Sequence, residues 1–250
     1  MEKRRSNLVS EIALSLVDYS LHVGGTEVLS DINLDIAATS LSLVAGPRWS
    51  GKSMLLRSFL GLNEEVIPGV SYSGKTLLFG KDASLMDTKD LRRRVAYTDS
   101  SFLGAIRQFS ILEFFRLTKG RNFTFTEFSD EELDMFEKMG ASELLREDPR
   151  IGIDSLSSFQ RLVLLILSVV FRKPEVIIFD NVLDHLDDEL VATLKDILAA
   201  RKATHTIVVS SRSYTRLLEI SDLMILLRNG RIQYTGSPFD FVLQDGALVR

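Results

Sequence analysis

Hydrophobic residues occur along this chain in short runs, and the spacing of these runs predicts alternating strands and helices. Near the start, two pieces with strand-like character flank a Gly24-Gly25 turn, as in an antiparallel hairpin layer. Later in the chain, short and purely apolar runs alternate with helical ones, which is typical of a mainly parallel sheet covered on both faces. Strands are predicted over residues 12–17, 32–36, 41–45, 76–79, 95–98, 176–179, 206–210, 223–227 and 232–234.

A different pattern fills the middle of the chain, over about residues 101–156. This stretch has no β-rich run and gathers aromatic residues, and Asp130–Leu145 combines an acidic start with a 3.6-residue spacing. We interpret it as a helical subdomain inserted into a single α/β domain, whose core covers residues 10–100 and 157–250. Other helices are predicted over residues 54–60, 162–171, 186–202 and 214–220.

Composition narrows the class of protein. A chain of 250 residues with 45% hydrophobic and 26% charged residues can enclose a real core and is not expected to be disordered. The absence of cysteine excludes disulfides, thiolate metal sites and cysteine nucleophiles, and three scattered histidines exclude a histidine-rich metal cluster. A net charge of −4 gives no long-range attraction to nucleic acid, so we expect no nucleic-acid partner.

The longest apolar runs also bear on location. They fall far short of the ~20 residues that cross a bilayer, and the start of the chain lacks the apolar stretch and cleavage pattern of a secretory signal. We therefore expect an intracellular chain whose role at a membrane, if it has one, goes through a partner.

The most specific motif is Gly46-Pro47-Arg48-Trp49-Ser50-Gly51-Lys52-Ser53, which satisfies G-x-x-x-x-G-K-[ST] between a predicted strand and a predicted helix. Ordinary residue frequencies would place this pattern in such a chain by accident with a probability of roughly 1%. In such a loop, backbone N–H groups surround phosphate oxygens, the lysine supplies a point charge and the serine hydroxyl can ligate Mg²⁺. The motif therefore predicts a nucleotide-binding site formed by Gly46, Pro47, Arg48, Trp49, Ser50, Gly51, Lys52, Ser53 and Met54.

An acidic residue at the end of an apolar strand is the second half of such a site. The predicted strand 176–179 is followed directly by Asp180, which would hold Mg²⁺ through water together with Ser53. A carboxylate in this place can also merely cap the next helix. With the phosphate loop upstream, the metal-binding interpretation is favoured.

The order of these motifs resembles that of the nucleotide-binding subunit of ATP-binding cassette (ABC) transporters, over nearly the whole chain. The resemblance rests on the phosphate loop, the helical insertion, Leu156-Ser157-Ser158-Phe159-Gln160-Arg161, Val176–Asp180 and Leu186-Asp187. Two further stretches, 61–75 and 91–95, are most similar to the ATPases of phosphate importers. The resemblance implies a P-loop NTPase fold that binds ATP with Mg²⁺.

The resemblance also implies partners and a location. In the family, two such subunits sandwich ATP between the phosphate loop of one and the signature sequence of the other, and they drive transmembrane subunits. This chain is thus expected to pair with a second nucleotide-binding subunit, of the same or a different kind, on the cytoplasmic face of the cell membrane. Asp184, His185 and Asp187 lie where the family's subunit-contacting loop runs, and Phe102 and Phe109 are candidates for a groove that receives a transmembrane partner. The plain alternatives are a solvated histidine and an aromatic core belonging to the insertion itself.

Three positions depart from the family's catalytic pattern. Asn181 stands where the family has a glutamate that activates the attacking water, and an amide cannot act as a general base. Ser211 stands at the switch-histidine position, and Ser100 stands where a glutamine usually ends the strand before the helical insertion. Without the motif framework, each of these would be an ordinary turn- or cap-forming residue.

Further departures affect nucleotide contact. The signature, usually L-S-G-G-Q, is Leu156-Ser157-Ser158-Phe159-Gln160, and side chains in place of its glycines should obstruct approach to the opposite nucleotide. Trp49 replaces a common glycine of the phosphate loop, and Val23 stands near the place of the aromatic residue that stacks on adenine. The chain is therefore expected to be a degenerate subunit that binds ATP weakly and hydrolyses it slowly. The alternatives are an active transport ATPase that needs its membrane partner, and a nucleotide-free interaction module in which Trp49 fills the loop.

Overall fold

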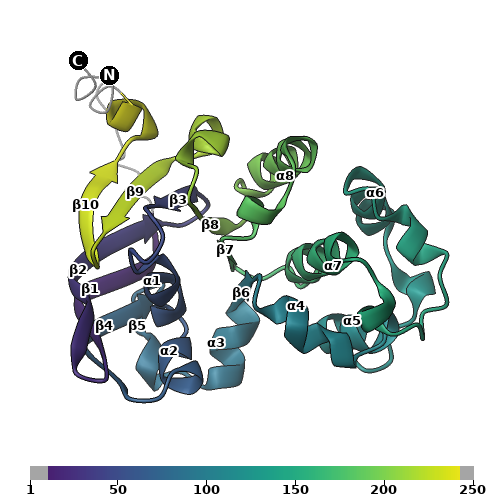
Figure 1. Cartoon of the computed structure of the whole chain (residues 1–250), viewed down its shortest axis with the longest axis horizontal. Helices are drawn as coiled ribbons and strands as arrows, with labels where there is room; N and C mark the ends of the chain where they lie inside the picture. The colour runs from purple at the N-terminus through teal and green to yellow at the C-terminus, as the bar shows by residue number, and fades with distance from the viewer. Residues whose placement is uncertain (1–10, 243–250) are drawn as a thin grey trace, which may run out of the picture.

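The computed structural model describes residues 11–242 and contains two sheets (Figure 1). The first has four strands in the order β2-β1-β4-β5, and all its neighbouring strands are antiparallel. Its hairpin turns at Gly24 and Gly25, whose φ angles of 56° and 81° lie in the left-handed region that glycine adopts most easily. The predicted antiparallel layer is confirmed. Its strands are β1 (Ile12–Val23), β2 (Thr26–Ala37), β4 (Val70–Leu78) and β5 (Lys81–Asp82).

The second sheet has six strands in the order β10-β9-β3-β8-β7-β6. Five neighbouring strands, from β9 to β6, are parallel, and β10 pairs antiparallel with β9 at one edge. Every residue of β3, β6, β7 and β8 is buried, as expected of strands covered on both faces. The predicted mainly parallel sheet is confirmed. Its strands are β3 (Leu41–Ala45), β6 (Val95–Asp99), β7 (Val176–Asp180), β8 (Thr206–Ser211), β9 (Leu223–Arg228) and β10 (Arg231–Gly236).

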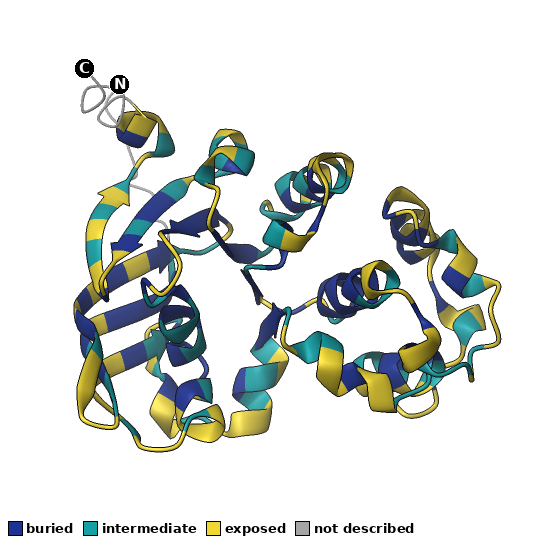
Figure 2. Ribbon diagram, viewed as in Figure 1, coloured by how far each residue is buried: buried dark blue, intermediate teal, exposed yellow. Residues whose placement is uncertain are grey.

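Alternation along the parallel strands divides the hydrophobic interior into two cores, one on each face of the sheet. In β7, Ile177 and Phe179 pack with α7 (Ser158–Phe171) and α8 (Asp188–Arg201). Val176 and Ile178 point the other way, toward α1 (Lys52–Ser58), α3 (Thr88–Arg94) and the antiparallel sheet. Figure 2 shows the central parallel strands as buried and the helices around them as partly exposed. This arrangement leaves only the ends of the parallel strands open for a site.

The stretch between β6 and α7 contains helices and turns but no strand among the described residues. Its helices are α4 (Phe102–Ala105), α5 (Ile111–Lys119) and α6 (Asp130–Lys138), and they gather with α7 at the end of the molecule away from the antiparallel sheet (Figure 1). The fully buried Phe115 lies at the centre, with its ring 5.1 Å from that of Phe128 and 5.9 Å from that of Phe136. These aromatic residues do not form the separate core that we expected but belong to the same core as α7 and one face of the parallel sheet, and Phe102 and Phe109 pack against it.

Several elements differ from the sequence-based predictions. The helices α2 (Leu62–Val66) and α3 were not predicted. Helix α3 buries only Leu91 and so has no apolar stripe that periodicity could reveal. The expected helix over 130–145 ends after α6, where Gly140 adopts a φ of 63°. The expected helix over 214–220 is two separate 3₁₀ turns, Tyr214–Arg216 and Leu218–Ile220. Other 3₁₀ turns cover Ala83–Leu85, Ile106–Gln108, Phe125–Glu127, Ser142–Leu145, Ile153–Ser155 and Leu183–His185.

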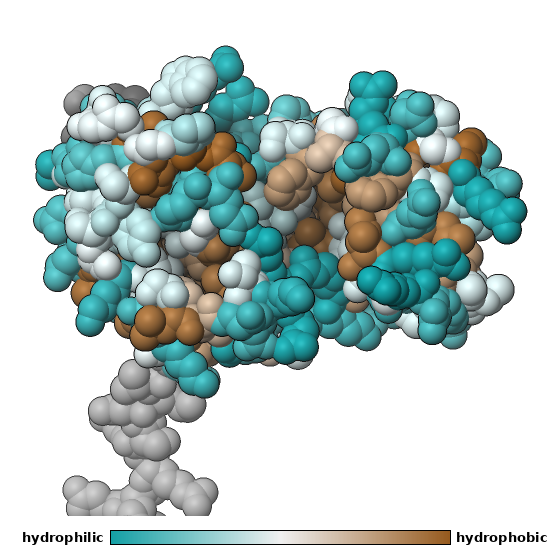
Figure 3. Space-filling model, turned by 90° about the horizontal axis from the view of Figure 1, so that it is seen from below, coloured by the Kyte–Doolittle hydropathy of each residue, from teal (hydrophilic) through white to brown (hydrophobic). Residues whose placement is uncertain are grey.

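The molecular surface is mixed in character. Figure 3 shows a mostly hydrophilic lower face on which hydrophobic residues form separate patches. The exposed large hydrophobic residues, such as Leu85 and Leu117, come from distant parts of the chain. Within residues 11–242, no helix combines the length and the hydrophobicity that a membrane span requires.

Candidate functional site

The parallel strands bring four chain segments together at one edge of the sheet. Register pairs Ala45 at the end of β3 with Ser211 of β8, Asp180 of β7 with Ser210, and Asp99 of β6 with Asp180. The segments that leave these strands therefore emerge side by side, as in other open parallel sheets that bind ligands at the carboxyl ends of their strands. One of these segments is the phosphate loop.

The phosphate loop closes tightly around the side chain of Lys52. The Lys52 Nζ donates hydrogen bonds to the backbone oxygens of Gly46 at 2.8 Å and Pro47 at 3.0 Å, and the residue is only 5% exposed. Burial lowers the pKa of Lys52, while the charges of Asp180 and Asp184 oppose that shift. At Gly46, a Cβ would lie 2.1 Å from the backbone oxygen of Leu227, so the loop requires glycine there. The loop is thus held in a compact form with its ammonium group inside.

A cavity of about 560 Å³ opens beside this loop. It lies in the size range of ligand pockets, and positive side chains dominate its charged lining. Trp49, with a φ of 67°, is 87% exposed at its rim, and the Arg48 guanidinium lies 5.0 Å from the indole ring. The lining residues are Val28, Arg48, Trp49, Ser50, Gly51, Lys52, Ser53, Met54, Arg57, Asn181, Asp184, His185 and Arg212.

Most of the residues that we expected to bind nucleotide line this cavity, but Gly46, Pro47 and Val23 are not part of its wall. Val23 pairs with Thr26 in the β1–β2 hairpin and is not one of the described residues that form the wall; Val28 is. Asp187, expected in the subunit-contacting loop, caps α8 by accepting a hydrogen bond from the backbone N–H of Leu190 at 2.9 Å.

Asp180 lies behind the cavity and is held by three hydrogen bonds. It is 1% exposed and accepts from the hydroxyl of Tyr97 at 2.9 Å, the hydroxyl of Ser210 at 2.5 Å and the side-chain amide of Asn181 at 2.9 Å. A carboxylate offers about four lone-pair positions, so one remains for a further donor or a metal-bound water. The carboxylate is therefore oriented by its neighbours before any ligand binds.

A second buried carboxylate, Asp99, extends this network. The hydroxyl of Tyr97 lies 2.8 Å from Asp99 and accepts a hydrogen bond from Arg57 Nε at 3.1 Å, while Arg57 Nη2 donates to Asp99 at 2.8 Å. A tyrosine hydroxyl has one proton, and Arg57 already satisfies Asp99, so that proton is available to Asp180. Burial, followed by the charges of Asp180 and Asp99, raises the pKa of Tyr97, which keeps the phenol neutral.

This network predicts a loss of stability in acid. Burial alone would raise the pKa of Asp99, but hydrogen bonds from Ser101 and Arg57 outweigh it and lower that pKa below its ordinary value of 3.8. Since the folded pKa lies below the unfolded one, the stabilisation is fully present above the ordinary value and is lost as the pH falls through the folded pKa. Urea unfolding of the wild-type chain should therefore show a steeper acid loss of unfolding free energy than that of Asp99→Asn. Parallel curves below about pH 5 would contradict this.

Both the backbone and the side chain of Asn181 form hydrogen bonds at the edge of the sheet. Its φ of 53° lies in the left-handed region, which asparagine tolerates better than most residues. Its backbone N–H donates to the Ser210 hydroxyl at 2.9 Å. Because its amide NH₂ faces Asp180, the side chain supports that carboxylate and offers no basic group to the cavity.

Ser211 and Arg212 are tied to Asp184 on the other side of the cavity. The Ser211 hydroxyl donates to Asp184 at 2.6 Å, and Arg212 Nε donates to the same carboxylate at 2.9 Å. The side chain of Asp184 is 5% exposed and that of Arg212 is 57% exposed. Asp184 thus anchors a cation at the cavity, while the exposed His185 follows it on the rim.

The signature residues 156–160 lead into α7 and are outside the cavity wall. The Ser157 hydroxyl accepts from the backbone N–H of Gln160 at 3.1 Å, and the Gln160 side chain accepts from the backbone N–H of Ser157 at 2.9 Å. This reciprocal capping box satisfies the first N–H groups of the helix. Leu156 is buried, Ser158 begins the helix, and Phe159 is 37% exposed on its first turn.

Ser100 begins a turn rather than lining the cavity. It follows Asp99 at the end of β6, and its carbonyl accepts a hydrogen bond from the backbone N–H of Leu103 at 3.3 Å. The adjacent Ser101 bonds Asp99 through its backbone N–H at 2.7 Å. The carboxylate at this strand end is therefore Asp99, one residue before the position that we singled out.

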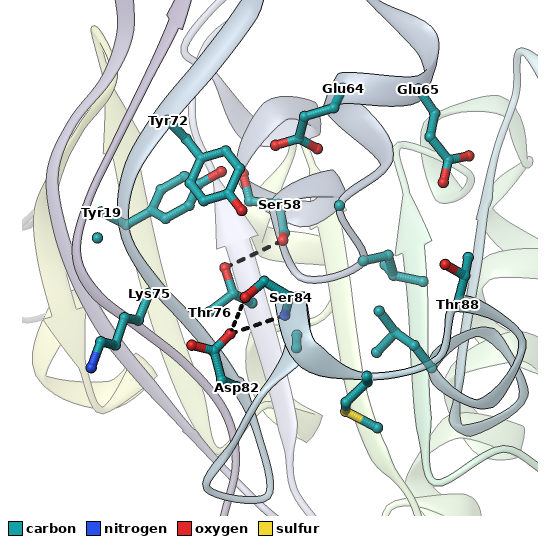
Figure 4. Close-up of a pocket in the computed structure, with 16 residues that line it drawn as sticks. Tyr19, Ser58, Glu64, Glu65, Tyr72, Lys75, Thr76, Asp82, Ser84 and Thr88 are labelled. Atoms are coloured by element: carbon teal, nitrogen blue, oxygen red, sulfur yellow. Dashed lines mark hydrogen bonds between the residues drawn. The ribbon is translucent and has the colours of Figure 1, made fainter.

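A second, smaller cavity of about 200 Å³ lies between the antiparallel sheet and α2 (Figure 4). The rings of Tyr19 and Tyr72 stack in its wall at 5.5 Å, and burial raises the pKa of Tyr19 to about 12. Glu65 forms an ion pair with Arg92 outside it. This cavity contains none of the phosphate-loop residues, so the larger cavity is the candidate site.

Sequence reasoning missed four polar residues of this edge: Arg57, Tyr97, Asp99 and Arg212. Arg57 and Arg212 belong to no motif that we recognised. Asp99 carried a signal, because a carboxylate ending the buried run 95–98 repeats the pattern of Asp180.

Comparison with known proteins adds a family match. A family model described as "ABC transporter" matches residues 29–184 of this chain. The phosphate import ATP-binding protein PstB of Pyrobaculum aerophilum is 31% identical over 228 residues, covering 89% of this chain and 90% of that protein. A putative ABC transporter ATP-binding protein of Methanosarcina acetivorans is 25% identical over 96% of this chain, which spans 39% of that longer protein.

Solved structures share the fold at low sequence identity. The structure of cbiO1 from Clostridium perfringens, part of the ABC transporter complex cbiONQ, aligns with a TM-score of 0.74 and 19% identity over 94% of this chain and 92% of that one. A bacterial Atm1-family ABC exporter with ATP bound aligns with a TM-score of 0.77 and 17% identity over 95% of this chain and 41% of that one. The P-loop NTPase fold that the family resemblance implied is therefore confirmed.

Proposed function

This chain belongs to the ABC transporter family, and from that premise we propose that it is a nucleotide-binding subunit that holds ATP with Mg²⁺ and hydrolyses it slowly. One observation carries the proposal. The cavity keeps the lysine and the serine of its phosphate loop, Lys52 and Ser53, but Asn181 at the sheet edge has no basic group. Binding and hydrolysis are therefore expected to be separated in this site.

The lining of the cavity fits a nucleotide phosphate. Lys52, Arg48 and Arg212 supply positive charge, and Ser50, which is 2% exposed, has a hydroxyl with no hydrogen-bond partner among residues 11–242. Burying such a hydroxyl costs free energy unless a ligand supplies the missing hydrogen-bond partner. A triphosphate would engage these donors and would compete with the backbone oxygens that now hold Lys52.

The oxygen donors present also fit Mg²⁺. Within the described residues there is no group of three or more His, Asp or Glu side chains able to hold a metal alone. Mg²⁺ does not need one, because it commonly binds through one or two protein oxygens together with substrate phosphates. Ser53 and Asp180 would provide these oxygens, and the bound ion would neutralise phosphate charge.

Slow hydrolysis follows from three side chains. The Asn181 amide is turned to Asp180 and cannot accept a proton from water. The Ser211 hydroxyl already donates to Asp184, and Ser100 begins a turn outside the cavity wall. Proton transfer by a positioned base is worth ~10²–10⁴-fold in rate, so its absence alone would lower turnover strongly.

Membership of the family also suggests the partners and the location that we propose. The chain would pair with a second nucleotide-binding subunit and with transmembrane subunits, and it would lie on the cytoplasmic face of the membrane through them. Likeness to the phosphate import protein PstB over most of both chains favours an importer. In such a complex this chain would have a structural or regulatory role beside a more complete ATPase subunit.

Nucleotide binding can be measured through Trp49, the single tryptophan of the chain, which lies on the rim of the cavity. Titration with ATP and Mg²⁺ should change its emission in a saturable way. Lys52→Ala should weaken the affinity by roughly 10–100-fold, because a hydrogen bond to a charged group contributes about 1.5–3 kcal/mol. Lys75→Ala, an exposed lysine of β4 outside this cavity, is the matched control and should bind as the wild type does. A calorimetric titration without saturable heat would refute the proposal and favour a nucleotide-free interaction module.

A further inference from the structure

The ion pair between Arg212 and Asp184 lies in the cavity but has no role in the proposed binding of Mg²⁺ or in the missing base. Arg212 is the first residue after β8, and both members of the pair line the same cavity as Lys52 and Asn181. The side chain of Arg212 is 57% exposed, although its carboxylate partner is almost fully buried. The guanidinium is thus anchored at one nitrogen and open to solvent at the others.

Strand register fixes where Arg212 leaves the sheet. Ser211 is paired with Ala45, the residue that precedes the phosphate loop, and Ser210 is paired with Asp180. Arg212 therefore emerges between the phosphate loop on one side and the Asp180–Asn181 strand end on the other. Lys52 donates to Gly46 and Pro47 on the same side, and both Arg212 and Asp184 act electrostatically on its ammonium group.

Asp184 holds this position firmly. It accepts from the Ser211 hydroxyl at 2.6 Å, from the backbone N–H of Arg212 at 3.2 Å and from Arg212 Nε at 2.9 Å. The first two donors satisfy the carboxylate even when the guanidinium leaves. When the Arg212 side chain leaves, Asp184 keeps these two hydrogen bonds and its electrostatic interaction with the positive charge of Lys52, which reduces the usual penalty for breaking a buried pair.

We propose that Arg212 is a specificity residue that exchanges Asp184 for the terminal phosphate of a nucleoside triphosphate. This inference rests on the proposed function and adds the discrimination between triphosphate and diphosphate. The terminal phosphate carries the additional charge that competes with Asp184, and guanidinium groups bind phosphate oxygens in a two-pronged geometry. A diphosphate lacks that group and leaves the ion pair in place.

The test is the ratio of the dissociation constants for Mg-ADP and Mg-ATP, measured by calorimetry. Arg212→Gln, which keeps most of the side-chain length without charge, should weaken ATP binding by about tenfold or more and ADP binding by less than about twofold. Asp184→Asn should tighten ATP binding, because it frees the guanidinium. Arg93→Gln is the control, since Arg93 is an exposed arginine of α3 outside this cavity, and it should leave both dissociation constants unchanged.

The alternative outcomes are distinguishable. Equal weakening of ATP and ADP by Arg212→Gln would overturn the specificity role while leaving the proposed function intact. Failure of the wild type to bind either nucleotide would overturn the proposed function and this inference with it. Arg212→Lys keeps the positive charge but lacks the two-pronged geometry of the guanidinium, so it should give an intermediate ratio of dissociation constants. It replaces Arg212→Gln if thermal unfolding shows that the glutamine variant is misfolded.

Discussion

Replacing Asn181 by glutamate is expected to raise ATP turnover by roughly 10²–10⁴-fold, the range that a positioned general base contributes. Asn181 leaves the end of β7 directly after Asp180 and lines the cavity that contains Lys52 and Ser53. A carboxylate at this place would face the same cavity and could accept a proton from water. The substitution removes the hydrogen bond from the Asn181 amide to Asp180. It also places glutamate at a φ of 53°, which glutamate adopts less readily than asparagine.

A matched control separates the base from side-chain length. Asn181→Gln is as long as glutamate but has no basic group, so it should leave turnover at the wild-type level. The measurement is phosphate release at saturating Mg-ATP, with thermal unfolding of both variants to show that they fold. Equal turnover of the glutamate and glutamine variants would mean that a missing base is not what limits this site.

Asp99→Ala is expected to destabilise the fold by about 3 kcal/mol, the lower end of the range for removing one partner of a buried ion pair. The Asp99 side chain is 7% exposed and that of Arg57 is 22% exposed, so the guanidinium would keep some contact with water. The substitution also removes the acceptor of the backbone N–H of Ser101 at 2.7 Å. Equilibrium urea unfolding measures this change.

The neighbouring residue of the same strand provides the control. Thr98 is 1% exposed, and its hydroxyl has no hydrogen-bond partner among residues 11–242, so Thr98→Val should be neutral or slightly stabilising. A double-mutant cycle with Arg57→Ala then isolates the coupling between the two partners. A loss for Asp99→Ala no larger than that of an exposed substitution, within about 0.5 kcal/mol, would contradict a structural role for the network.

The core of the fold could be predicted because burial leaves a direct mark on the sequence. Each residue of β3, β7 and β8 is covered from both sides, so these strands are short runs with little polar interruption. The helix α3 leaves no such mark. It contains Arg92, Arg93 and Arg94 and buries only Leu91, so its position depends on packing that periodicity does not reveal.

The candidate site divides in the same way. The phosphate loop is contiguous, so its spacing alone predicted that Lys52 and Ser53 line one cavity. The bonds of Asp180 to Tyr97, 83 residues away, and to Ser210, 30 residues away, depend on strand register. A single sequence does not specify register between strands so far apart.

Two further residues keep their expected roles as predictions. Val23, which the family resemblance puts near adenine, lies in β1 and pairs with Thr26 across the hairpin. Asp184, expected in a subunit-contacting loop, accepts hydrogen bonds from Ser211 and Arg212. These contacts of Asp184 cannot be derived from residue type, because they depend on how its loop packs against the end of a strand 27 residues away in the sequence.

The most direct measurement of the central claim is phosphate release from Mg-ATP by the isolated wild-type chain at a concentration that saturates the Trp49 signal, compared with Lys52→Ala. We expect bound nucleotide, with phosphate release indistinguishable from that of the Lys52→Ala variant. Release well above that of Lys52→Ala would contradict this expectation, because a general base elsewhere in the cavity would then be activating water.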